Sequence, residues 1–220
     1  MQLIDKTYKR LIGLYSPYYY FALFVFASIL LSLAINTFIL TDEVFYKSYA
    51  ERYSIEKIQS LAETISEIEW FIYLLTPVFY LFKFFVVAIV LSTGDFLFGY
   101  KIGFKKMFQI AMVAELVFLL PDLIKIVWFL FFEQAETIKQ VGSFEFLSIY
   151  SLFKNDEIYN WLKYPFSVAN VFELIYWLVL ALGIKYVTGF NYDKSLKFIL
   201  STYVPVLIVW VMFIMFLSIM

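Results

Sequence analysis

Long apolar runs, each about the length of a membrane crossing, constrain this chain more than any other feature. A helix rises about 1.5 Å per residue, so roughly 20 mostly apolar residues cross the hydrocarbon core of a bilayer. Five segments meet this condition: 21–40, 70–91, 107–132, 168–188 and 198–219. The sequence therefore predicts an all-α polytopic transmembrane bundle with about five spans. It forms a single integral membrane domain over residues 1–220, with outer loops at 41–69 and 133–167.

The composition suits a protein that is surrounded by hydrocarbon, and it lacks the side chains that most often carry out catalysis or bind metals. Apolar residues make up 63% of the chain and charged residues 16%, which is too apolar for a soluble domain to bury. The net charge of −1 gives no basic signal for nucleic acid. Without Cys or His, the chain lacks a thiolate, the commonest general base and the commonest transition-metal ligand. We therefore expect no catalytic residues, no metal, no cofactor and no enzyme.

The distribution of charge predicts the orientation. The N-terminal segment and the 92–106 and 189–197 loops fall on one side of the membrane. Their basic residues are Lys6, Lys9, Arg10, Lys101, Lys105, Lys106, Lys194 and Lys197. The two longer loops on the other side carry twelve acids. Because basic loops stay in the cytoplasm, we expect the N-terminus inside and the C-terminus outside.

The two outer loops have patterns of their own. Apolar residues recur at helical spacing over 42–69, so this stretch is predicted to be a helix with one acidic face. It either extends the first span or lies against the bilayer surface. The second outer loop is expected to be partly buried, which makes a small outer cap.

Lys83 and Glu115 are the sharpest features inside the spans. Each lies eight residues from the predicted inner end of its span, at a depth of roughly 12 Å. The two spans are joined by a short loop, so an ion pair is predicted. A charge inside the membrane is costly and usually finds a partner in the bundle. The pair is either structural or part of a functional relay or ligand site.

Three further charges fall inside spans. Asp122 and Lys125 are three residues apart on one helical face, so they either pair or flank a break near Pro121. Glu173 is either interfacial or a second partner for Lys83. Counting depth places Glu115 and Glu173 near opposite faces of the membrane, which argues against a catalytic carboxylate pair.

Prolines inside three spans predict kinks. Pro77, Pro121 and Pro205 lie in the second, third and fifth spans. Pro77 and Pro121 fall at matching depth, so they mark either a cavity or flexible waist, or two unrelated packing kinks. The third span is either continuous or broken near Pro121.

The last two thirds of the chain resemble a known family. The landmarks are a glycine-bearing inner loop, a Leu-Pro step, an aromatic-led fourth span ending in Gly, and a Lys-Ser step before the last span. They stand at 99–108, 120–121, 170–177, 182–184 and 193–196. This pattern is similar to the bacterial type of the Yip family, membrane proteins named for binding Ypt/Rab GTPases. The resemblance covers about 70–220 and implies five spans with an inward N-terminus. The acidic-aromatic-Gly-Pro motif of eukaryotic members is absent, so the resemblance does not imply Rab binding.

Three functions are open at this point. A Yip-like, non-enzymatic scaffold or interaction protein comes first, and a small permease or transporter subunit using the intramembrane charges is the alternative. A membrane enzyme is the third. Expected partners are the lipid bilayer and either further copies of the chain or other membrane proteins. Lys-rich, Arg-poor usage favours a bacterial cytoplasmic membrane.

Overall fold

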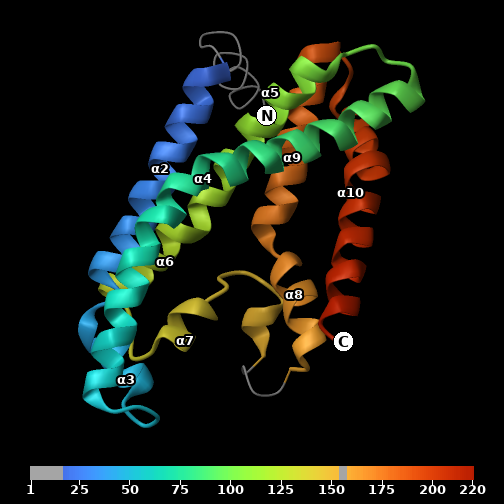
Figure 1. Cartoon of the computed structure of the whole chain (residues 1–220). Coiled ribbons are helices and arrows are strands. Elements are labelled where there is room, and N and C mark those ends of the chain that lie inside the picture. Colours follow the sequence, from blue (N-terminus) through green and yellow to red (C-terminus); the bar gives the residue numbers. More distant parts are fainter. Residues whose placement is uncertain (1–16, 154–157) are drawn as a thin grey trace. The chain divides into compact units, whose positions relative to one another are not determined.

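The chain folds into helices throughout the part that the structure, a computed structural model, describes: residues 17–153 and 158–220. The N-terminal Lys6, Lys9 and Arg10, on which the predicted orientation partly depends, lie outside the described residues. In chain order the elements are α2 (Pro17–Phe38), α3 (Asp42–Tyr49), α4 (Ile55–Phe98), α5 (Phe104–Glu115), η1 (Leu116–Phe118), α6 (Leu119–Phe131), α7 (Ile138–Gly142), η2 (Tyr150–Leu152), α8 (Asn160–Val168), α9 (Val171–Thr188) and α10 (Tyr192–Leu217) (Figure 1).

Four helices are long and apolar enough to cross a membrane: Tyr18–Phe38, Ile55–Phe98, Val171–Thr188 and Tyr192–Leu217. Large apolar side chains stand exposed along them, such as Phe79 and Phe82 on α4 and Val209 on α10. Exposed apolar surface on this scale is costly in water and suits contact with lipid tails. The chain is an all-α polytopic integral membrane protein, as the apolar runs predicted.

The predicted third span is broken. Helix α5 ends at Glu115, the 3₁₀ turn η1 follows, and α6 starts at Leu119. Pro121 accounts for the break, because its ring lacks an N–H and clashes with the carbonyl four residues earlier, at Val117. The sequence left this span either continuous or broken near Pro121. The structure has the broken form, with two short helices. The count of five spans stays a prediction.

The stretch 42–69 is not one helix, and its larger part belongs to the helix of the second span. Helix α3 is a separate short helix after α2 ends at Phe38, and the turn at residues 50–54 follows it. From Ile55 the chain continues as one helix into the second span. Of the two alternatives for 42–69, extension of the first span is therefore excluded, and the expected single helix is divided by the turn at residues 50–54. The apolar spacing runs from Ile55 through Trp70 without a helix breaker, so nothing separates the amphipathic part from the span.

The described part of the chain divides into two compact units. Unit 1 contains residues 17–24, 81–118, 147–153 and 158–220, and unit 2 contains residues 25–80 and 119–146. In unit 1, α9 packs against both α5 and α10. Its core contains the fully buried side chains of Leu91, Ile110, Leu180 and Ile199.

Unit 1 also contains the short connection between α4 and α5. Gly99 and Gly103 adopt positive φ angles of 70° and 88°, which let the chain reverse direction without strain. The buried carboxylate of Asp95 accepts hydrogen bonds from the backbone N–H groups of Ile102 and Gly103 at 2.9–3.1 Å. Asp95 therefore fixes the point at which α5 begins.

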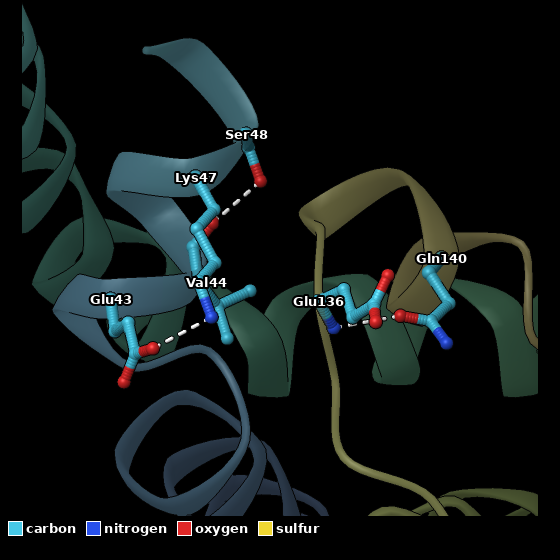
Figure 2. A network of polar contacts seen from close by, with 6 residues as sticks. All are labelled: Glu43, Val44, Lys47, Ser48, Glu136 and Gln140. Atoms are coloured by element: carbon cyan, nitrogen blue, oxygen red, sulfur yellow. Dashed lines mark hydrogen bonds and ion pairs between the residues drawn. The ribbon is translucent and has the colours of Figure 1, made fainter.

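Unit 2 contains the short helices α3 and α7, which pack against each other. The N–H of Ile138 donates to Ser48 Oγ at 2.9 Å, while Ser48 Oγ donates to the Val44 carbonyl. Figure 2 shows this region, with the exposed Glu43–Lys47 ion pair at 2.6 Å. Ile39, Phe129 and Val141 form the apolar cluster of the unit.

Candidate functional site

Lys83 and Glu115 form the ion pair that their predicted depth suggested. Lys83 Nζ on α4 donates to Glu115 Oε1 at the end of α5. The two side chains differ in burial, because Glu115 is 1% exposed and Lys83 is 48% exposed. A buried carboxylate without a cation would carry a large desolvation cost, so Lys83 is what allows Glu115 to be charged in this place.

Glu173 joins the same group of charges. It lies in the first turn of α9, is 8% exposed, and is within Coulombic reach of both Lys83 and Glu115. Of the two alternatives for Glu173, the structure favours the buried partner over the interfacial residue. The estimate that Glu115 and Glu173 lie near opposite faces is wrong. Glu173 lies in the first turn of α9 and Glu115 at the end of α5, so depths counted along the apolar runs did not give the distance between the two acids.

Two neutral donors hold Glu173. Trp177 Nε1 donates to Glu173 Oε1 at 2.8 Å from one turn further along α9. Tyr203 OH donates to the same oxygen at 3.1 Å from α10. Hydrogen bonds to a carboxylate stabilise its charge and fix its orientation. Donors on α9 and α10 therefore position Glu173, and Lys83 on α4 positions Glu115.

Aromatic rings line the charges. Lys83 Nζ lies 4.5 Å from the centre of the Phe118 ring. Phe118 lies 5.0 Å from the ring of Tyr176, which lies 5.5 Å from the ring of Tyr203. These rings line one part of the site, where they lower the local dielectric constant and so strengthen charge interactions.

Each of the two acids lies next to an interruption of helix. The first is η1, directly after Glu115, and the second is the turn at residues 169–170 between α8 and α9. Helix α9 packs against η1. At the second interruption Asn170 Oδ1 accepts from the Glu173 N–H at 2.8 Å, and Ser148 and Asn170 form a short β-bridge. These contacts satisfy backbone groups that an interrupted membrane helix would otherwise leave unpaired.

Asp122 and Lys125 are not part of this cluster. They belong to unit 2, where they lie in Coulombic reach of each other and of Glu145. Burial raises the pKa of the Glu145 carboxyl, and the charge of Lys125 offsets part of that rise. The structure therefore divides the five predicted charges: Lys83, Glu115 and Glu173 come together, and Asp122 and Lys125 form a separate group.

The predicted kink positions have different outcomes. Helices α4 and α10 continue through Pro77 and Pro205, so these prolines interrupt neither helix. Pro121 follows a break. The chain passes from unit 2 to unit 1 at residue 81 and back at residue 119, each within four residues of Pro77 or Pro121. The two prolines that the sequence predicts to lie at matching depth are therefore close to the two points at which the chain passes from one unit to the other.

Sequence reasoning missed three members of the site: Asn170, Trp177 and Tyr203. Two of them had a readable signal. Asn170 precedes Glu173 by three residues, which is the spacing of an N-cap and its N3 acid, and Trp177 follows Glu173 at the i,i+4 spacing of helical neighbours. Tyr203 had none, because only the packing of α9 against α10 brings it to Glu173.

The described residues contain no group of three or more Asp or Glu side chains that could hold a metal ion. In comparisons with known proteins, no family model, no curated protein and no solved structure matches the chain. What the chain does must therefore be argued from the membrane-spanning helices and from the cluster of Lys83, Glu115 and Glu173.

Proposed function

We propose that the chain is a small, non-enzymatic permease or the membrane subunit of one, and that the Lys83–Glu115–Glu173 cluster is its ion site. The observation that carries this proposal is the position of two buried carboxylates, Glu115 directly before the turn η1 and Glu173 in the first turn of α9, the helix that packs against η1. Interrupted helices near the middle of a membrane form substrate and ion sites in many transporters, because they offer polar groups where a continuous helix has none.

The cost of the cluster supports a functional role. Placing Glu115 and Glu173 in a bundle costs free energy that apolar side chains of similar size would not. Ionisable residues inside membranes line ion pathways and proton relays more often than they serve packing. A protein without this function would gain stability from Leu or Met at these positions.

Currents from the reconstituted protein test the proposal. Proteoliposomes on a solid-supported membrane are exposed in turn to jumps in Na⁺, K⁺ and pH. We expect a protein-dependent charge movement after at least one jump, and its loss in Glu115→Gln. Glu63→Gln, which changes an exposed acid on α4, should keep the current. Folded protein that gives no current after any jump would overturn the proposal.

A second candidate is a Yip-like scaffold. It is favoured by the burial of two landmark residues of the family resemblance, Gly183 in α9 and Ser195 in α10. Small buried residues let membrane helices pack closely. This candidate predicts a stable protein without current in the same experiment, and an oligomer in light scattering of the purified protein.

A further inference from the structure

The charge cluster contains more negative than positive groups. Helix α5 contributes Glu115, α9 contributes Glu173, and α4 contributes Lys83. The other titratable groups that act on these charges are phenols: Tyr203 on α10, with Tyr164 on α8 in its Coulombic reach. Tyr176 adds its ring to the lining. With both acids ionised and the phenols neutral, the cluster carries a net charge of −1.

The oxygen atoms of Glu115 are unequal. Oε1 accepts from Lys83, whereas Oε2 is buried and has no hydrogen-bond partner among the described residues. Water and lipid head groups would satisfy an exposed carboxylate oxygen, but the Glu115 side chain is 1% exposed. A buried charge that lacks compensation is expected to be neutralised by taking up a proton.

Glu173 cannot supply the missing compensation. Its Oε1 atom accepts from Trp177 and Tyr203, which are neutral donors and leave its full charge in place. Among the described residues, Lys83 is the cation that acts on both acids, and its ammonium is already bonded to Glu115. Two carboxylates that repel each other and share one ammonium cannot both be ionised at low cost.

We propose that Glu115 and Glu173 together hold one exchangeable proton, with Lys83 as their fixed counter-charge. The inference rests on the proposed permease function in one respect: it names the proton as the ion that the site binds. The proton adds to a carboxylate oxygen and leaves from the same oxygen to water, so no other bond changes. It belongs to the pair of acids, because two interacting sites titrate together.

The number of held protons follows from the number of acids and bases. The native cluster, with two acids and one base, holds one proton at neutral pH. Glu115→Gln or Glu173→Gln leaves one acid matched by Lys83, so neither variant should hold a proton. Lys83→Met leaves two acids without a base and should hold two. A purely structural ion pair would change differently, since both acids would stay ionised in the native protein.

Infrared spectroscopy of the purified protein in detergent measures these protons through the C=O stretch of a protonated carboxyl. Relative to the native spectrum at neutral pH, we expect a loss of equal size in Glu115→Gln and Glu173→Gln. A gain of the same size is expected in Lys83→Met. Glu63→Gln serves as the control and should leave the band unchanged, because this exposed acid is ionised at neutral pH.

The experiment decides the question even if Lys83→Met does not fold, because each Gln variant keeps Lys83 and one of the two acids. Native and Gln-variant spectra without a difference in this band would overturn the inference. A current in the reconstituted protein without the band would leave the permease standing and remove the proton. The band without a current would keep the proton and remove the permease.

Discussion

The two units treat buried charge in different ways. In unit 1, Glu115 and Glu173 are buried, and each makes direct bonds to named donors: Lys83 for the first, Trp177 and Tyr203 for the second. In unit 2, Asp122, Lys125 and Glu145 are partly exposed and act on one another through Coulombic interactions. Acidic and basic residues of the same kinds therefore form a group with two buried carboxylates in one unit and a partly exposed group in the other.

The number of charges inside the spans therefore indicates less about a functional site than the partners of each charge do. All five charges predicted from the sequence lie in or near spans, so apolar context alone ranks them equally. Burial and direct hydrogen bonds distinguish the two groups, because the interaction between two charges becomes much stronger as water is removed. The comparison can be sharpened by removing a partner from each group.

The largest effect is expected for Lys83→Met. It leaves Glu115 and Glu173 without their cation, so both acids must take up protons at neutral pH to stay buried, which costs about 3 kcal/mol or more in the free energy of unfolding. Thermal unfolding in detergent should show the loss, with most of it recovered in the Lys83→Met, Glu115→Gln double variant. The loss should also shrink at acidic pH, where protons neutralise the acids more readily.

The matched control is Asp122→Asn in unit 2, for which we expect a loss below about 1 kcal/mol. Equal losses for Lys83→Met and Asp122→Asn would break the contrast between the units. A double variant no more stable than Lys83→Met would show that the two side chains do not compensate each other.

An intermediate effect is expected for Gly94→Ala, which tests packing in unit 1. A Cβ atom at Gly94 on α4 would lie 2.1 Å from Thr202 Cγ2 on α10 and 2.9 Å from Thr202 Cβ. The two helices must shift, at a cost of about 1–3 kcal/mol measured by thermal unfolding. Thr202→Ala in the same chain should relieve part of this cost.

Gly142→Ala in unit 2 is the matched glycine change, because nothing lies within 4 Å of a Cβ built there. We expect its unfolding free energy to stay within about 0.5 kcal/mol of the native value. If both glycine variants behave alike, the close approach of α4 and α10 is not a constraint on stability.

The smallest effect is expected at Glu145. Burial raises the pKa of this carboxyl, so the folded chain binds its proton more tightly than the unfolded chain does. Its contribution to stability is therefore fully present below the ordinary Glu pKa, and falls as the pH rises through the raised pKa. Stability curves against pH should be flatter in this window for Glu145→Gln than for the native protein. Identical curves would contradict the assignment.

The sequence predicted part of the site for a clear reason. Lys83 and Glu115 flank a short loop between two apolar runs, so counting residues from the loop fixes their relative depth. The same counting failed for Glu173, because its closeness to Glu115 depends on the packing of α9 against the turn η1 that follows Glu115. Tyr203 is 30 residues from Glu173 in the sequence, and a hydrogen bond over that distance depends on helix packing.

By itself, the sequence determined that the chain is a helical membrane protein. Only a bilayer accommodates apolar runs of this length, and only helices satisfy their backbone groups within one segment. The tertiary structure decided where the third span breaks, which charges come together and which remain apart. Those outcomes depend on contacts between distant segments, and the hydropathy of a segment carries no information about its neighbours in space.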